Sequence, residues 1–378
     1  MTAEANRLPT AAAVVVDLPG DVPRLTSFYL YMTAGCNLRC RHCWITPTFV
    51  NGEPSPGECI NPELLKQAVK EAKPLGLKSA KLTGGEPLMH PQFRDIAAFL
   101  KSEGIHSDME TNGILIDPSM ARFLKDETNV EFVSVSLDSV DTAKHDAFRG
   151  VKGAFDAAVQ GIRNLVEVGY RPQIIMSPHR DNLGEVDAMV EMAGALKAGS
   201  LKFNPVANSG RGSRMHEEGE ALDYEAHRAL IRYVNGELQK RSKVPLFIGA
   251  PMAMLTLDDL LKNRWRGVCN VDHIMGLLGT GHMALCGIGK NVQELSYGEL
   301  GKDNLRDVWC AHPFLKELRK GIKGPFAGIC GDCIHAGRCR TGCLAMHYLD
   351  GGKLFSPSPL CSEADRRGEF PMARRKQT

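Results

Sequence analysis

The stretch Met32-Thr-Ala-Gly-Cys36-Asn-Leu-Arg-Cys40-Arg-His-Cys43 places three cysteines in a C-x3-C-x2-C loop, and the next cysteine, Cys59, lies well beyond it. Structural metal sites normally close with four ligands, so three cysteines would leave one metal position open for a small molecule. The preceding run, Leu25 to Tyr31, predicts a strand. Because parallel α/β folds place their chemistry at the carboxyl ends of strands, the loop is the candidate chemical centre. A zinc knuckle and three buried thiols are the competing interpretations.

Composition bounds the class of protein. A chain of 378 residues with 43% hydrophobic residues suggests a large domain plus a smaller one. The net charge of +2 gives no general attraction to nucleic acid or to a membrane surface. The run Ala11 to Val16 is too short for a signal peptide, and no apolar run is long enough to span a bilayer. We therefore expect a cytoplasmic protein that binds neither nucleic acid nor membranes.

The cysteines are unevenly distributed. Of twelve, three lie in the loop, Cys59 stands alone, and eight fall between Cys269 and Cys361. A reducing compartment disfavours disulfides, so this clustering is typical of metal sites. Cys59 and Cys310 are expected to be buried thiols.

Strand-like runs alternate with amphipathic segments through the first two-thirds of the chain. The predicted strands are Phe28–Met32, Ser79–Leu82, Ile105–Glu110, Phe132–Ser136, Gln173–Met176 and Leu201–Phe203. The predicted helices are Pro62–Ala72, Pro91–Ser102, Pro118–Leu124, Ala154–Val168, Leu183–Leu196 and Tyr224–Lys240. Strand–helix alternation at this spacing predicts an α/β fold with a parallel sheet, a partial (β/α)6 TIM-like barrel. A boundary is expected near residue 245.

A second motif, Gly84-Gly85-Glu86-Pro87, follows the second predicted strand. Two glycines allow close approach of the backbone to a ligand, and Glu86 can accept a hydrogen bond from an ammonium group. Together with the cysteine loop it resembles the radical SAM superfamily. The resemblance implies that Cys36, Cys40 and Cys43 hold a [4Fe–4S] cluster whose open iron chelates S-adenosylmethionine (SAM).

Four more positions follow the same strands and extend the resemblance. Asn112, Ser136, Asp138 and Arg149 carry amide, hydroxyl, carboxylate and guanidinium groups that suit the cofactor, although each also fits turn or cap chemistry. The SAM-binding residues implied by the resemblance are Gly84, Gly85, Glu86, Pro87, Asn112, Ser136, Asp138 and Arg149.

The last third of the chain resembles the seven-cysteine SPASM extension of some radical SAM enzymes. Its spacings are C-x11-G-x4-C from Cys269 to Cys286 and C-x2-C-x5-C-x3-C from Cys330 to Cys343, followed by Cys361. The resemblance implies two auxiliary [4Fe–4S] clusters. Cluster I would use Cys269, Cys286 and Cys343, and cluster II would use Cys330, Cys333, Cys339 and Cys361.

Cluster I is one ligand short in this assignment. An open iron and a ligand from Asp272, His273 or Cys310 are the alternatives. A zinc ribbon is the competing interpretation of the paired cysteines. The expected organisation is an extension over 1–25, a radical SAM barrel over 26–245, a SPASM domain over 246–365 and a solvated basic tail over 366–378.

The resemblance implies a radical enzyme that cleaves SAM and removes hydrogen from its substrate. The leading hypothesis is maturation of a ribosomally made precursor peptide, by a thioether or carbon–carbon crosslink or a related change. Sulfatase maturation is weakened because that subgroup carries Asp where this chain has Gly287. A small-molecule radical dehydrogenase and a non-catalytic iron–sulfur electron-transfer protein are further alternatives.

The expected partners follow from this hypothesis. Residues 1–25 are too few for a leader-binding domain. A precursor peptide would therefore be recognised by the barrel and SPASM surfaces or by a separate leader-peptide-binding protein. Flavodoxin or ferredoxin is the expected electron donor.

Overall fold

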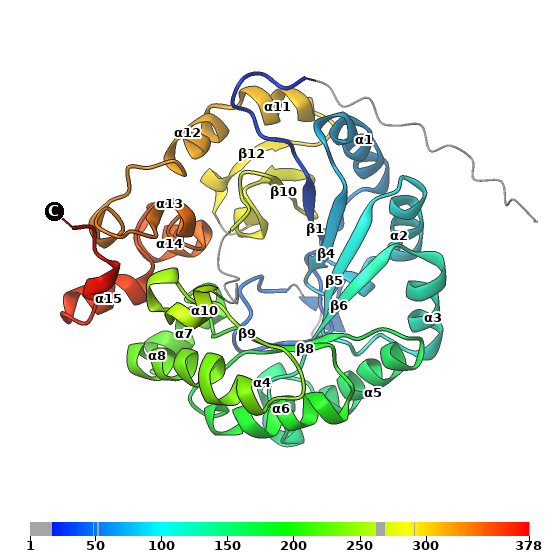
Figure 1. The fold of residues 1–378 in the computed structure, drawn as a ribbon. Coiled ribbons are helices and arrows are strands. Elements are labelled where there is room, and N and C mark those ends of the chain that lie inside the picture. The colour runs from blue at the N-terminus through cyan, green and yellow to red at the C-terminus, as the bar shows by residue number, and fades with distance from the viewer. Residues whose placement is uncertain (1–16, 48, 51–52, 262–268, 291, 378) are drawn as a thin grey trace, which may run out of the picture.

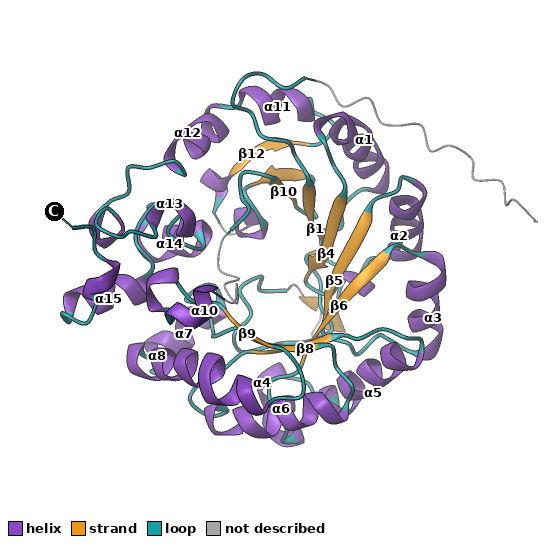
Figure 2. Ribbon diagram, in the orientation of Figure 1, coloured by secondary structure: helices purple, strands orange, loops and turns teal. Residues whose placement is uncertain are grey.

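One curved sheet with helices around its outer side forms the body of the protein (Figures 1 and 2). The structure is a computed structural model that describes residues 17–47, 49–50, 53–261, 269–290 and 292–377. Within these residues the strand order of the large sheet is β12-β11-β10-β1-β4-β5-β6-β7-β8-β9. The strands are β1 Ser27–Thr33, β4 Ser79–Gly84, β5 His106–Thr111, β6 Val130–Ser136, β7 Gln173–Met176, β8 Ser200–Phe203, β9 Leu246–Ile248, β10 Ile274–Leu277, β11 His282–Ala284 and β12 Ser296–Glu299. A separate hairpin pairs β2 Phe49–Val50 with β3 Glu53–Pro54.

Six neighbouring strands of this sheet, β1, β4, β5, β6, β7 and β8, run parallel to one another, as the sequence predicts. They correspond to the six predicted strands. The α/β prediction is confirmed. The parallel arrangement also continues beyond the expected boundary, because β9 pairs with β8 and β10 pairs with the free side of β1. The antiparallel strands β11 and β12 extend this edge. The sheet therefore includes strands on both sides of residue 245.

Alternation along each strand separates two faces of the sheet. Leu82, Met109 and Phe203 are fully buried in the apolar layer beneath the helices. Their neighbours on the same strands are polar and face inward, away from that layer. Met109 and Met176 are packing residues, as expected.

The helices begin where the sequence provides caps. The Asn61 side chain accepts hydrogen bonds from the backbone N–H groups of Glu63 and Leu64, and Asp117 caps the next helix but one in the same way. The helices of this part are α1 Pro62–Ala72, α2 Phe93–Ser102, α3 Pro118–Glu127, α4 Thr142–Arg149, α5 Ala154–Glu167, α6 Val186–Ala195, α7 Arg211–Glu217, α8 Tyr224–Tyr233 and α9 Gln239–Arg241.

Two helical predictions need correction, and two helices were missed. The helix expected from Pro91 begins at Phe93, because the His90 ring accepts the Gln92 N–H and holds a turn there. The single long helix expected over 224–240 is interrupted by a π-helical turn, Val234–Leu238. Helices α4 and α7 were not predicted.

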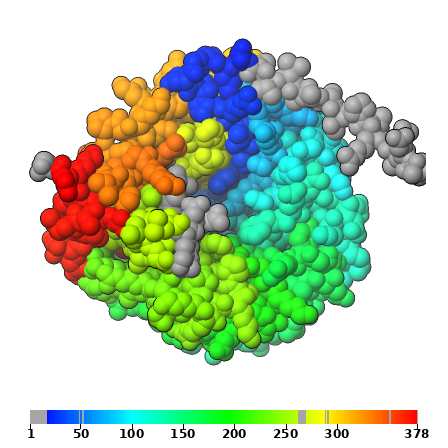
Figure 3. Space-filling view, in the orientation of Figure 1, coloured from blue at the N-terminus to red at the C-terminus, as the bar shows by residue number. Residues whose placement is uncertain are grey.

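The C-terminal third contains short helices rather than long ones. They are α10 Leu257–Leu261, α11 Leu305–Ala311, α12 Pro313–Gly321, α13 Ala336–Cys339, α14 Leu344–Gly351 and α15 Pro359–Arg366. Figure 3 shows that the last segments, orange to red, gather on one side of the ring. Residues 1–16 of the predicted N-terminal extension lie outside the described residues.

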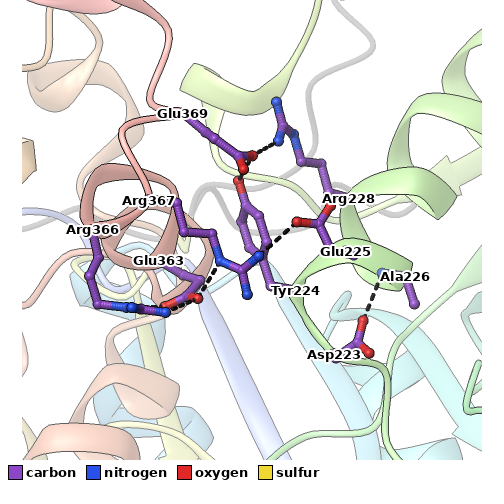
Figure 4. A network of polar contacts seen from close by, with 9 residues as sticks. All are labelled: Asp223, Tyr224, Glu225, Ala226, Arg228, Glu363, Arg366, Arg367 and Glu369. Carbon is purple, nitrogen blue, oxygen red and sulfur yellow. Dashed lines mark hydrogen bonds and ion pairs between the residues drawn. The ribbon is translucent and has the colours of Figure 1, made fainter.

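An ion-pair network joins α15 to α8 (Figure 4). Arg367 pairs with Glu225 at 2.8 Å, Glu369 pairs with Arg228, and the Tyr224 hydroxyl donates to Glu369. The expectation of a solvated basic tail is wrong for the described residues: Ile334 N donates to the Arg374 carbonyl oxygen at 2.9 Å. Acidic partners and a backbone pairing, neither visible in the spacing of the arginines, hold the tail to the protein.

Two further structural observations bear on the expectations. Cys59 and Cys310 are partly exposed, so they are not the buried thiols expected. In the described residues, no helix is long and apolar enough to cross a membrane.

Candidate active site

The cysteine loop 36–43 follows β1 and is held from two sides by backbone hydrogen bonds. Arg39 N donates to the Arg149 carbonyl oxygen at 3.0 Å, and Arg41 N donates to that of Phe148 at 2.9 Å. At the far end, Arg211 N donates to the Cys43 carbonyl oxygen at 3.0 Å. The carboxyl end of α4 and the start of α7 therefore fix the loop's path.

The loop thiols receive N–H donors. Leu38 N lies 3.4 Å from Cys36 Sγ, and an Arg149 guanidinium nitrogen lies 3.5 Å from Cys40 Sγ. Burial, with the nearby charges of Glu86 and Cys40, raises the pKa of Cys36 to about 12. A buried thiol in this state becomes a thiolate only with a compensating cation, which an iron centre supplies. The donor set therefore fits the implied cluster, since N–H groups directed at sulfur are what ligating thiolates require.

Glu86 is completely buried and its carboxylate is held by the protein. It accepts hydrogen bonds from Thr111 Oγ1 and Asn112 N, both at 2.8 Å, and from Leu88 N at 3.3 Å. Burial raises the pKa of Glu86 to about 7 despite these donors. This position beside the loop suits acceptance of a hydrogen bond from the cofactor's amino group.

The two glycines before Glu86 serve close packing of backbone on backbone. A Cβ at Gly85 would lie 1.8 Å from the Gly35 carbonyl oxygen, and one at Gly84, where φ is +128°, would lie 2.6 Å from that of Thr33. Gly85 N and Glu86 N donate to these same two carbonyl groups at 2.8 Å. The observed reason for the glycines is therefore contact with the cysteine loop itself, and contact with a ligand stays a prediction.

Asn112 also bonds the loop. Its side-chain nitrogen donates to Asn37 Oδ1 at 2.7 Å and lies 3.8 Å from Cys36 Sγ. Pro87 opens a short 3-10 helix, Pro87–Met89, which Glu86 caps. Ser136 ends β6 and is partly exposed. Asn112 therefore contacts the loop directly, and the roles of Pro87 and Ser136 in SAM binding stay predictions.

Asp138 and Arg149 form a buried ion pair. The guanidinium lies 2.5 Å from Asp138 Oδ2, and Asp138 Oδ1 accepts a hydrogen bond from Ser177 N at 2.8 Å. The Arg149 charge helps to hold the pKa of Asp138 below its usual range against the effect of burial. Both residues therefore brace the loop in the structure, and their contacts with the ribose and carboxylate of SAM stay predictions.

The structure adds two features that the sequence analysis did not identify. His42 stacks on Phe148, which stacks on His179, with ring centroids 4.5 Å and 4.2 Å apart. Arg211 has two buried guanidinium nitrogens without a hydrogen-bond partner in the described residues. Burial lowers the pKa of His42 to about 3, and the charges of Arg149 and Arg211 lower it further. The Gly210-Arg211-Gly212 run was the available sequence signal.

The four cysteines predicted for cluster II converge. Cys330, Cys333, Cys339 and Cys361 line one small cavity, with His335 beside them. Burial, and then the neighbouring thiols Cys339 and Cys333, raise the pKa of Cys330 to about 12. The set fits a cluster because four cysteines line one space, and their thiolates, which repel one another, would be stabilised by the positive charge of bound iron.

The three cysteines predicted for cluster I also lie near one another. Burial, followed by the charges of Cys343 and Cys286, raises the pKa of Cys269 to about 12. Asp272 is buried and pairs with Arg340 at 2.9 Å through one oxygen, and its other oxygen has no hydrogen-bond partner in the described residues. Among the alternatives for a fourth ligand, Asp272 is therefore the one with a free buried donor atom.

Gly287, directly after Cys286, has a steric reason. A Cβ there would lie 1.8 Å from Cζ of Tyr31, whose ring fills the space and packs edge-on against Trp44 at 5.9 Å. The Tyr31 phenol thus occupies the position that a side chain at 287 would take. The Tyr31 ring therefore contacts both Trp44, the residue after Cys43, and Gly287, the residue after Cys286.

In the described part of the chain, no three His, Cys, Asp or Glu side chains converge closely enough to hold a single metal ion. The cluster ligands therefore stay predictions, supported by the donor sets and burial described above.

The comparisons with known proteins agree with this site. A family model for the radical SAM superfamily matches residues 30–193. An AdoMet-dependent heme synthase of Methanosarcina barkeri is 30% identical over 353 residues, which cover 90% of this chain and 97% of the relative. The chain belongs to the radical SAM superfamily. It is accordingly an enzyme of a family that uses a [4Fe–4S] cluster and SAM.

Other relatives of this radical SAM enzyme include a peptide maturase. The mycofactocin maturase MftC of Mycolicibacterium smegmatis is 27% identical, with 88% of this chain and 81% of the relative covered. The solved structure of SuiB from Streptococcus suis bound to S-adenosylmethionine shares the fold with a TM-score of 0.69 and 17% identity. That match covers 90% of this chain and 77% of SuiB, so the shared fold includes most of the cysteine-rich third.

Proposed function

We propose that this enzyme modifies a ribosomally made precursor peptide, using SAM bound at Cys36, Cys40 and Cys43. When bound, the reduced cluster and SAM supply a 5′-deoxyadenosyl radical that removes a hydrogen atom from the substrate. The observation that carries the proposal is the combination of this loop with the four-cysteine cavity. Two similar proteins support the peptide: MftC is named a maturase, and SuiB was solved bound to the precursor peptide SuiA.

The chain's own residues would bind and orient the reacting groups. Glu86 would accept a hydrogen bond from the amino group of SAM, and the buried Asp138–Arg149 pair would keep the loop rigid. Auxiliary clusters at Cys269, Cys286 and Cys343 and at Cys330, Cys333, Cys339 and Cys361 would bring the total to three [4Fe–4S] clusters. They would receive or deliver electrons, with flavodoxin or ferredoxin as donor.

The product proposed is a thioether or carbon–carbon crosslink or a related change. Recognition of the peptide would involve the barrel and C-terminal surfaces or a separate leader-peptide-binding protein. A binding experiment distinguishes these two modes of recognition. Precursor-peptide binding is measured with the isolated enzyme and again after adding a small protein encoded by a neighbouring gene.

A second candidate rests on a specific observation. The relatives at 30% and 31% identity are named AdoMet-dependent heme synthase and Fe-coproporphyrin III synthase. A small-molecule radical oxidation is therefore the alternative substrate class.

One anaerobic experiment tests both. The reconstituted enzyme is supplied with dithionite and SAM, and then with a co-expressed precursor peptide or with iron-coproporphyrin. We expect 5′-deoxyadenosine in every arm, and a mass change of about two hydrogens in the peptide arm alone. Conversion of the porphyrin alone would replace the peptide proposal, and absence of 5′-deoxyadenosine would contradict both.

A further inference from the structure

The inner face of the sheet, below the cysteine loop, carries a charged cluster formed by Tyr29, Lys81, Glu110 and Lys202. Lys81 Nζ lies 2.5 Å from Glu110 Oε1, and their side chains are 27% and 35% exposed. The Lys81 ammonium also lies 5.4 Å from the centre of the Tyr29 ring. Since Lys81 and Glu110 alternate with fully buried Leu82 and Met109, both point inward, away from the helices.

Lys202 lies on β8, three positions along the sheet from β5, and its side chain is on the same inner face. It alternates on β8 with Leu201 and Phe203, which are fully buried on the helix side. Burial lowers the pKa of Lys202; the charge of Glu110 raises it and that of Lys81 lowers it further. Because β6 and β7 separate β5 from β8, these charges reach Lys202 across the inner face rather than along the sheet.

The anions on this face lie beside Lys81 rather than beside Lys202. Glu110 is bound by Lys81, and the Thr83 hydroxyl donates to its other oxygen at 3.5 Å. The Lys202 ammonium group has no hydrogen bond or ion pair among the described residues, and the residue as a whole is only partly exposed. Asp108 lies in register with Lys81 on the neighbouring strand and is exposed, so it is a second anion beside Lys81. An anionic ligand would therefore add a charge-assisted hydrogen bond to the Lys202 ammonium, which no anion of the described residues supplies.

The cluster also lies where a substrate would need to be. The charge of Glu110 acts on the phenol of Tyr31, which contacts Trp44 beside the cysteine loop and Gly287 beside Cys286. Tyr31 therefore connects the Glu110 side of this cluster with residues next to both predicted cluster sites. A group bound to Lys202 would be held at the inner side of the sheet, under the loop.

We propose that Lys202 binds a carboxylate group of the substrate, with the Lys81–Glu110 pair limiting the site to one anionic group. This deepens the proposed function and rests on it for the peptide, whose carboxylate would belong to the C-terminus or to an acidic side chain. A carboxylate fits because it accepts a charge-assisted hydrogen bond from an ammonium group, while the adjacent Glu110 repels a second anion.

The test measures acetylation of individual lysines in the reconstituted full-length enzyme by mass spectrometry. The probes are N-acetylalanine, which resembles a peptide C-terminus, and propionate, which resembles an acidic side chain. Their neutral amides are the matched controls, and the exposed Lys240 is the internal reference. We expect a carboxylate to slow labelling of Lys202 about fivefold relative to Lys240, and the amides to change the ratio by less than about 1.5-fold. The more protective probe identifies the kind of carboxylate.

A charge variant sharpens the result. Glu110→Gln releases the Lys81 ammonium and should lower the concentration for half-protection of Lys202 by about threefold. Equal effects of acids and amides, or protection of Lys202 and Lys240 alike, would overturn the inference. Formation of 5′-deoxyadenosine in the same samples reports on the proposed function separately, because that reaction does not require Lys202.

Discussion

The two cysteine-rich regions of the chain are held in place in different ways. Loop 36–43 follows a strand of the large sheet, and backbone hydrogen bonds with the end of α4 and the start of α7 fix it. The cavity of cluster II instead belongs to a small separate core in which Cys333 and Cys361 are themselves buried members. A small core supplies little stability by itself. We therefore expect loop 36–43 to be folded before a metal cluster binds, whereas the core around Cys333 and Cys361 would depend on its cluster for folding.

The largest expected effect separates the two regions by cysteine removal. Cys40→Ser should abolish SAM cleavage and leave the sheet folded, because the loop has its own hydrogen bonds. Cys333→Ser should unfold the small core and increase hydrogen exchange over residues 325–370 by about tenfold or more. Anaerobic SAM cleavage and hydrogen exchange measure the two outcomes. Unchanged exchange in Cys333→Ser would contradict the comparison.

A steric substitution tests how tightly Gly287 and Tyr31 are packed against each other beside the large sheet. Gly287→Ala should lower the free energy of unfolding by about 3 kcal/mol, because the new Cβ meets the Tyr31 ring. In a Tyr31→Ala background this cost should largely disappear, which a double-mutant cycle of denaturant melts measures. Gly194→Ala in α6 is the control, since no atom lies within 4 Å of its new Cβ.

A smaller effect concerns Glu86 and pH. Its pKa of about 7 means that the carboxyl is protonated below that pH and ionised above it. As the ionised form accepts the hydrogen bond from SAM, affinity should rise with pH up to about 7 and then level off. Glu86→Gln should weaken SAM binding by about 1.5–3 kcal/mol and flatten the dependence, as measured by anaerobic equilibrium dialysis. A persistent pH dependence in Glu86→Gln would assign it to another group.

The smallest effect concerns the ion pairs that hold α15 to α8 (Figure 4). Glu369→Gln removes the partner of Arg228 and should cost about 0.5–1 kcal/mol at low salt, because the pair is partly exposed. Raising the salt concentration should reduce the loss. Thermal melts at two ionic strengths measure it, and a salt-independent loss would point to packing instead.

Local patterns accounted for most of the barrel. Strand alternation and Asn61 or Asp117 caps act over a few residues, so single-sequence reasoning found them. The loop cysteines and Glu86 were found because their motifs are contiguous. Lys202, the His42–Phe148–His179 stack and the Tyr31–Gly287 contact join residues far apart in sequence, and no local pattern encodes such contacts. The start of α2 was misplaced because His90 makes a turn that Pro91 alone does not reveal.

The pairing of β10 with β1 has a consequence for synthesis on the ribosome. Thr26 bonds to a partner 247 residues later, so one edge of the first strand waits for most of the chain to be made. During that time the edge presents unpaired backbone groups that neighbouring nascent chains could join. Pairing of β10 with β1 is thus a late, long-range event in folding. A chimaera that takes its C-terminal third from a relative should therefore retain residues 274–299 of the protein that supplies the barrel.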